Sequence, residues 1–182
     1  RLNRILYIDL EKKVARIQAG VTIHQLCEAL AEHDLAVGTL GTIDWQTVVG
    51  AAMTGTHGGS ITTPALHAFM EAYKFVKADG SIAEVKRTQG SAPFSAMAPS
   101  MGVFGVVVEA EVRCVPLQHL EACFTTMPFK EMIPQFATII NSNKYARIVV
   151  YPTIDIATIW TANPIEPGEA VARGAVRATG YM

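Results

Sequence analysis

The stretch that decides the fold is Val48–Ser60, VVGAAMTGTHGGS, in which glycines, threonines and a serine surround a single histidine. Glycine allows the backbone to adopt positive φ and to approach a ligand closely. Successive free N–H groups in such a stretch can form a concave nest for an anion such as a pyrophosphate. The pattern favours a loop that contacts a ligand. It leaves open a tight turn or a close helix crossing that needs small side chains.

The composition is that of a globular protein. The 182 residues suffice for one full domain, or for one domain and part of another. Hydrophobic residues make up 50% and charged residues 17%, and this low charge content favours a surface that is covered by further protein. The formal net charge of -1 argues against general attraction to nucleic acid or anionic lipid. No apolar run reaches the roughly 20 residues of a transmembrane segment.

Around this stretch, hydrophobic periodicity predicts antiparallel strands and few helices. The best helix is Thr22–His33, where Thr22 and Gln25 form a capping box. A second, short helix is expected over 94–100, and 64–70 is expected to be a turn or short helix. The pair Asp79-Gly80 between two strand-like runs predicts a hairpin. Strands are expected at 5–10, 14–19, 72–78, 82–86 and 101–115.

A new unit is predicted from Leu117 onward. It contains a strand that runs to Thr126, a helix over 128–142 and two strands at 146–151 and 154–161, followed by an irregular tail from Pro164. We therefore expect an α+β fold with an antiparallel sheet flanked by helices over residues 1–116. The start of a second α+β domain is expected over residues 117–182.

Several common site motifs are missing from the sequence. It has no G-x-G-x-x-G after a strand, no P-loop and no G-x-S-x-G elbow. The histidines lack the spacing of metal ligands, and so do the three cysteines, which we expect to be buried thiols, so no metal site is predicted. His57 is either a structural histidine or part of a ligand site. His24 is expected to face solvent without a chemical role, and Trp45 and Trp160 are expected to be packing residues.

Three segments together resemble a known family. They are VARIQAGVTIHQLCEALAEHDLAVGTLGTIDWQTVVGAAMTGTHGGS, KFVKADGSIAEVKR and FSAMAPSMGVFGVVVEAEVRCVP. In this order and spacing they resemble the second half of the FAD-binding domain of vanillyl-alcohol-oxidase-type flavoproteins, in the aldonolactone oxidoreductase branch. The resemblance covers residues 1–116. The later segment SNKYARIVVYPTIDIATIWTANP is similar to the start of the substrate or cap domain in that branch.

The resemblance implies FAD as the cofactor. It places the stretch 47–60 along the flavin and its pyrophosphate, and it assigns main-chain hydrogen bonds to the segment 105–107. Gly41 corresponds to a position where a small residue lets oxygen reach the flavin ring. The residues implied to contact FAD are Gly41, Thr47, Gly50, Ala51, Thr54, Gly55, His57, Gly58, Gly59, Ser60, Gly105, Val106 and Val107.

The resemblance also implies an activity. A flavoenzyme of this branch transfers hydride from a sugar lactone carbon to flavin N5, and the electrons then pass to oxygen or cytochrome c. The family's upstream subdomain and the far end of its cap domain are absent, so the chain is expected to be incomplete at both ends and offers no catalytic residue. A truncated relative that serves as an assembly subunit of a mitochondrial respiratory complex is the alternative. Mitochondrial placement rests on the resemblance.

Overall fold

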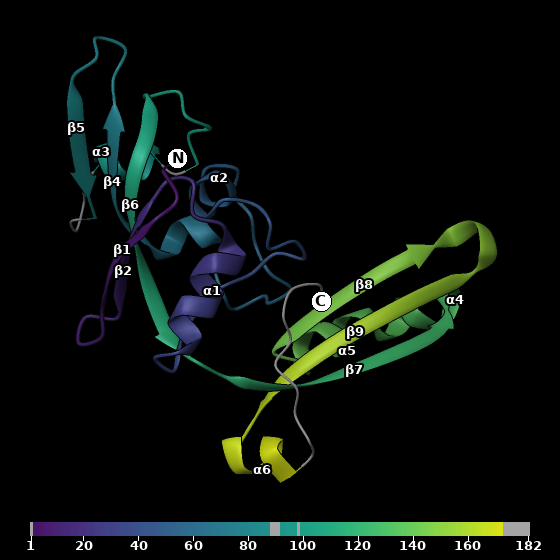
Figure 1. Cartoon of the computed structure of the whole chain (residues 1–182). Helices are drawn as coiled ribbons and strands as arrows, with labels where there is room; N and C mark the ends of the chain where they lie inside the picture. The colour runs from purple at the N-terminus through teal and green to yellow at the C-terminus, as the bar shows by residue number, and fades with distance from the viewer. Residues whose placement is uncertain (1, 88–91, 98, 173–182) are drawn as a thin grey trace. The chain divides into compact units, whose positions relative to one another are not determined.

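The computed structural model describes residues 2–87, 92–97 and 99–172. Within these residues the chain forms two compact units (Figure 1). Unit 1 comprises residues 2–57 and 65–117, and unit 2 comprises residues 58–64 and 118–172. The chain therefore passes from unit 1 to unit 2 between His57 and Gly58, within the quoted stretch.

Unit 1 is built on an antiparallel sheet in the order β1-β2-β6-β4-β5, and β3 pairs with the far end of β6. The hairpin between β4 and β5 turns at Gly80, whose φ is 81°, and the Gly80 N–H donates to the Lys77 carbonyl at 3.0 Å. The predicted Asp-Gly turn is confirmed. The strands are β1 (Ile5–Asp9), β2 (Val14–Gln18), β3 (Leu35–Val37), β4 (Met70–Val76), β5 (Ile82–Lys86) and β6 (Val106–Pro116).

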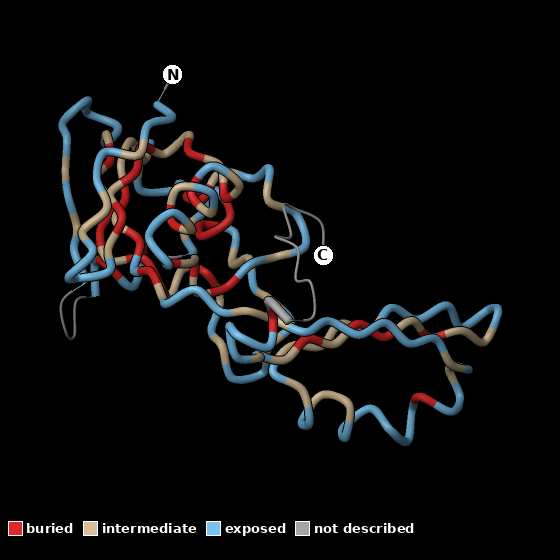
Figure 2. The backbone as a smooth tube through the Cα atoms, turned by 60° about the horizontal axis from the view of Figure 1, so that its bottom comes forward, coloured by how far each residue is buried: buried red, intermediate tan, exposed pale blue. Residues whose placement is uncertain are grey.

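The core of unit 1 lies between one face of this sheet and the helices. Alternate strand residues such as Ala15 and Ile17 face inward and pack with apolar residues of α1 (Ile23–Ala31), α2 (Val48–Met53) and α3 (Ala92–Met97). Figure 2 shows buried positions recurring along these strands and helices. A short 3-10 helix, η1 (Leu66–Phe69), leads into β4.

The predicted capping box at the start of α1 is present. Thr22 Oγ1 accepts from the Gln25 N–H at 3.1 Å, and Gln25 Oε1 accepts from the Thr22 N–H at 3.1 Å. We expect Thr22→Ala to lower the free energy of unfolding by about 1 kcal/mol, because the Gln25 N–H loses its acceptor. Urea denaturation measures this change. A loss near zero would show that the cap contributes nothing.

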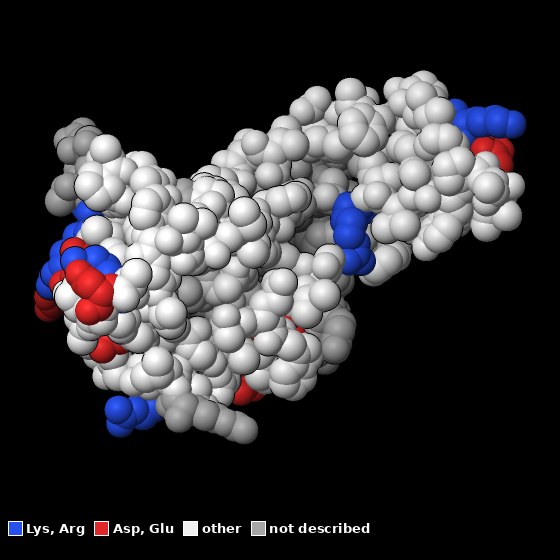
Figure 3. Space-filling view, turned by 90° about the horizontal axis from the view of Figure 1, so that it is seen from above, with Lys and Arg blue, Asp and Glu red and all other residues white. Residues whose placement is uncertain are grey.

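The opposite face of the sheet carries a charged network centred on Arg16, whose side chain is 12% exposed. Its guanidinium donates to Glu84 at 2.7 Å, to Glu109 at 2.8 Å and to Glu111 at 3.0 Å. Lys74 Nζ adds a bond to Glu109 at 3.2 Å. In Figure 3 acidic and basic side chains intermingle on the side of the β4–β5 hairpin, whereas most of the visible face is uncharged. The network thus joins two cationic and three acidic side chains on one face of the sheet.

The network makes the stability of unit 1 depend on pH in acid. Hydrogen bonds from Arg16 hold the pKa of both Glu109 and Glu84 below the ordinary value. Folding therefore favours the ionised carboxylates, and their contribution is complete above the unfolded pKa of about 4.3 and is lost as pH falls through the lowered folded pKa. We expect the free energy of unfolding, measured in urea, to fall below about pH 4.5. A flat profile there would contradict the network's role.

Unit 2 contains a three-stranded antiparallel sheet in the order β7-β9-β8. The strands are β7 (His119–Pro128), β8 (Tyr145–Tyr151) and β9 (Ile156–Ile165). Ala157 and Ile159 on one face pack with Met132 and with partly buried Phe129 and Ile139 of the helical segment. The remaining elements are α4 (Phe129–Met132), η2 (Ile133–Gln135), α5 (Phe136–Asn141), η3 (Pro152–Ile154) and α6 (Pro167–Ala172).

The observed fold confirms the α+β prediction with an antiparallel sheet flanked by helices. Several local predictions were wrong, and the strand expected over 101–115 begins only at Val106. The helix expected over 128–142 is broken by a 3-10 turn that contains Pro134, because proline lacks an N–H and clashes with the preceding turn. The tail expected from Pro164 is regular up to Ala172. Cys123 is exposed on β7, an edge strand of its sheet, rather than buried.

Candidate functional site

The first half of the quoted stretch is a helix, not the loop that its glycines predicted. Thr47 caps α2, its Oγ1 accepting from the Gly50 N–H at 3.1 Å. Val48, Val49, Ala51, Ala52 and Met53 are buried and anchor α2 in the core. Gly50 and Thr54 remain exposed, so the outward side of α2 carries only small side chains.

The stretch turns sharply after α2. Gly55 has φ 73°, a left-handed conformation that favours glycine, and among the described residues other than its chain neighbours no atom lies within 4 Å of where its Cβ would be. The backbone there is held by the Gly55 N–H to Ala52 at 3.2 Å and by the Thr56 N–H to Ala51 at 2.9 Å. The space in front of Gly55 is therefore open to a ligand.

Gly41 lies beside this turn. A Cβ at Gly41 would lie 3.0 Å from Thr56 Cγ2, so the residue must be small for the two segments to pass each other. The next residue along, His57, is exposed. The structure thus brings together Gly41, Thr54, Gly55 and His57, all of them residues that the sequence assigned to a cofactor site.

A second predicted segment reaches the same end of α2. The Met101 N–H donates to the Met53 carbonyl at 3.3 Å, and Ser100 Oγ donates to Met53 Sδ at 3.2 Å. These contacts place the loop 100–105, which leads to Gly105, against the end of α2. Segments that are about fifty residues apart in sequence therefore form one surface in unit 1.

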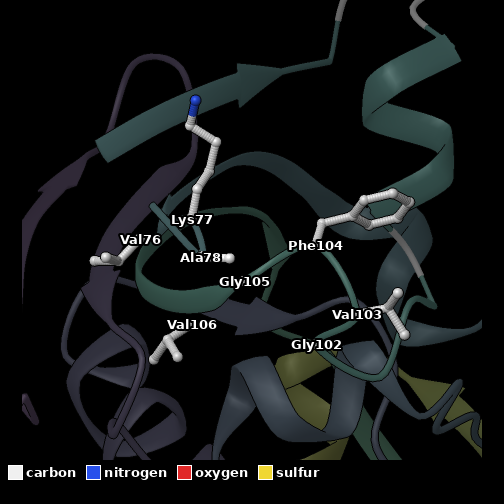
Figure 4. A pocket seen from close by; sticks show the side chains of 8 residues that line it. All are labelled: Val76, Lys77, Ala78, Gly102, Val103, Phe104, Gly105 and Val106. Atoms are coloured by element: carbon white, nitrogen blue, oxygen red, sulfur yellow. The ribbon is translucent and has the colours of Figure 1, made fainter. Parts of the chain in front are cut away.

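The loop ends at a small apolar pocket of about 250 Å³ (Figure 4). Val103 is 80% exposed and Val106 is 70% exposed, whereas Val107 packs against the core. Gly105 has φ 139°, and a Cβ there would collide with the Val76 carbonyl, so glycine is required at this position whether or not a ligand binds. The pocket is lined by Val76, Lys77, Ala78, Gly102, Val103, Phe104, Gly105 and Val106.

The last three residues of the quoted stretch belong to unit 2. Gly59 accepts from the Ala146 N–H of β8 at 2.8 Å, and a Cβ at Gly59 would lie 2.5 Å from the Ala146 carbonyl oxygen. Ser60 Oγ accepts from the Thr63 N–H at 3.2 Å. Close packing on β8 is thus a reason for glycine at position 59 that requires no ligand. The structure groups Gly58, Gly59 and Ser60 with β8 of unit 2.

One cluster near Gly41 was not predicted. His24 Nδ1 lies 3.0 Å from Asp44 Oδ2, and the Trp45 ring stacks on the His24 ring with centroids 5.4 Å apart. Trp45 is 62% exposed, so the expectation that it is a packing residue was wrong, whereas Trp160 is buried. His24 is half-buried rather than free in solvent. Helical periodicity alone could not reveal a contact with a residue 20 positions away.

The described ranges contain neither a metal-binding cluster nor a membrane-spanning helix. No group of three or more His, Cys, Asp or Glu residues there could hold a metal ion. In the same ranges no helix is both long and apolar enough to cross a bilayer.

Comparisons with known proteins agree with the geometry of unit 1. Residues 1–86 match the family model described as an FAD binding domain, which confirms FAD as the cofactor. Mouse L-gulonolactone oxidase is 30% identical over 84% of this chain and 34% of its own length. The mitochondrial L-galactono-1,4-lactone dehydrogenase of Brassica oleracea is 26% identical over 90% of this chain and 27% of its own. D-arabinono-1,4-lactone oxidase of Yarrowia lipolytica is 28% identical over 88% of this chain and 30% of its own length.

A solved structure of another protein has a similar fold. The chain superimposes on an alkyldihydroxyacetonephosphate synthase structure with a TM-score of 0.75 at 15% identity, over 95% of this chain and 38% of the other. This likeness concerns the fold alone. The chain spans about a third of the length of the curated relatives it matches. Residues 1–86 therefore match an FAD binding domain, and the chain as a whole is similar to the sugar-lactone oxidases and dehydrogenases named above.

Proposed function

We propose that this chain is part of a flavin-dependent oxidoreductase that oxidises a sugar lactone. The similar proteins are named as oxidases or dehydrogenases of L-gulonolactone, L-galactono-1,4-lactone and D-arabinono-1,4-lactone. Their shared substrate chemistry is a five-carbon or six-carbon sugar lactone. Bound FAD would supply the redox chemistry by accepting hydride at N5, and the protein would supply orientation and electrostatics.

The observation that supports this proposal most strongly is the turn at Gly55. Its left-handed backbone and the open space before it would let the main chain approach a flat group. Thr47, Gly50 and Thr54 add a side of α2 with no bulky group. The residues of unit 1 thus fit a dinucleotide that lies along the end of α2.

We assign the remaining contacts as follows. The loop before Gly105 and the pocket beside Val106 offer an apolar surface and main-chain groups to the same cofactor. Ala51 and Val107 would contribute only backbone, because their side chains face the core. Gly58, Gly59 and Ser60 are proposed as further cofactor contacts from unit 2.

Gly41 is relevant to which molecule accepts the electrons from the flavin. Gly41 passes close to Thr56 without a side chain, and we propose that the small residue lets oxygen reach the flavin. Cytochrome c is the alternative acceptor. The plant relatives are named mitochondrial, and we propose the same compartment for this protein.

The purified full-length protein tests the proposal. Its visible spectrum should show bound flavin, and dichlorophenolindophenol should be reduced when one of three 1,4-lactones is added: L-galactono, L-gulono or D-arabinono. The matching open-chain acids are the control, because they lack the lactone ring. Bound flavin without lactone-dependent reduction would reject the substrate class, and absence of flavin after FAD is added would reject the enzyme.

A further inference from the structure

The unpredicted cluster of His24, Asp44 and Trp45 joins α1 to the segment before α2. The His24 N–H donates to the Asp44 carbonyl at 2.9 Å, so His24 holds Asp44 through both its main chain and its ring. Glu28 Oε2 lies 3.7 Å from His24 Nε2 on the other side of the ring. His24 is therefore fixed between two carboxylates and beneath one indole.

Asp44 and Trp45 of the cluster lie in the irregular segment that leads from β3 to α2. From Asp44 onward the chain runs along the start of α1: the Ile23 N–H donates to the Gln46 carbonyl at 2.9 Å, and the Val48 N–H donates to the Val21 carbonyl at 2.9 Å. Residues 38–46, which carry Gly41 and Asp44, have no regular secondary structure. The His24–Asp44 contact is thus the first anchor after Gly41.

Two features of the cluster do not favour the folded state, which argues that the cluster has a role other than stabilising the fold. Asp44 Oδ1 is buried and has no hydrogen-bond partner among the residues that the structure describes. An unsatisfied buried acceptor destabilises the folded state. Trp45, held face to face with the imidazole, exposes most of its surface instead of packing in the core. Main-chain bonds hold Asp44 and residues 46–48, and the side chains add a restraint on the Asp44 carboxylate and the Trp45 ring.

We propose that His24 is a positioning residue that acts through Asp44 and Trp45. It holds the segment 38–43 in the arrangement that lets Gly41 and the Gly55 turn receive the flavin ring. This inference rests on the proposed function, because it assumes that FAD binds at the Gly55 turn.

The test compares variants of the full-length protein in a Trp160→Phe background, and the emission of Trp45 is taken as the difference from the same variant carrying Trp45→Phe. His24→Leu removes the bond between the His24 ring and Asp44 but keeps the main-chain bond, and His24→Asn restores a side-chain N–H near the position of Nδ1. His33→Leu is the matched control, since His33 is an exposed histidine just beyond α1. Thr22→Ala is the stability control, because it weakens the start of α1 without touching the cluster.

Two quantities are measured: the dissociation constant for FAD and the fluorescence emission of Trp45. We expect His24→Leu to change the emission and to weaken FAD binding about ten-fold, a typical effect of a supporting hydrogen bond. His24→Asn should restore most of the affinity, and both controls should bind FAD as the parent does.

The outcomes separate the two proposals. Equal FAD affinity in His24→Leu and the parent would overturn the positioning role, and so would an equal loss in Thr22→Ala, which would mean that general loosening of α1 is the cause. Unchanged Trp45 emission would overturn the stacking geometry. If the parent itself binds no FAD, the proposed function fails.

Discussion

Replacing Gly55 with valine is expected to abolish FAD retention. Valine is poorly tolerated at the φ of 73° found here, and its branched side chain would fill the open space through which the main chain approaches the cofactor. The flavin absorbance that co-purifies with the protein measures the loss. We expect it to fall at least a hundred-fold per mole of protein, which corresponds to about 2.7 kcal/mol of binding free energy.

Gly80 supplies the matched control for this substitution. It too has a left-handed φ, 81°, and no atom within 4 Å of a Cβ, but it lies at the exposed β4–β5 turn. Gly80→Val should therefore impose a similar backbone strain of roughly 1–2 kcal/mol while FAD is retained. If both variants keep flavin, or if both lose it equally, the Gly55 turn is a structural feature and not a cofactor contact.

Replacing Arg16 with methionine is expected to have the largest effect on stability. Methionine keeps much of the apolar stem, but Glu84, Glu109 and Glu111 lose their shared cation and repel one another. Removing one partner from this partly buried ionic network costs about 2 kcal/mol, between the values for exposed and buried ion pairs. Urea denaturation at neutral pH measures this loss, and it should shrink in acid, where the carboxylates are protonated.

An exposed ion pair provides the comparison for Arg16. Lys12 lies 3.4 Å from Asp9, and its side chain is 80% exposed. Lys12→Met should change the free energy of unfolding by less than about 0.5 kcal/mol, because exposed pairs contribute little. A similar small change for Arg16→Met would show that the network does not stabilise unit 1.

Local signals in the sequence predicted the elements whose causes are local. The capping box of Thr22 and Gln25 fixed the start of α1, and the Asp79-Gly80 pair fixed the β4–β5 hairpin. β3 was missed because three residues carry too little periodicity to be detected. α2 was missed because its glycine and alanines suggested a loop, whereas the Thr47 cap and burial in the core make it helical.

In the candidate site, too, the sequence predicted local features but not the contacts between distant segments. The sequence identified Gly55 and Gly105 as special, and both have the positive φ that favours glycine. It could not show that Gly105 packs against Val76 or that Gly59 packs against Ala146, since such contacts depend on chain pairing distant in sequence. The cluster around His24 was beyond prediction for the same reason.

An experimental structure of the FAD-loaded full-length protein tests the central claim most directly. The quantity to measure is the distance from the main-chain atoms of residues 54–57 to the nearest cofactor atom. The account predicts van der Waals contacts of about 4 Å at the Gly55 turn. A cofactor bound elsewhere, with the Gly55 turn facing only water, would contradict it.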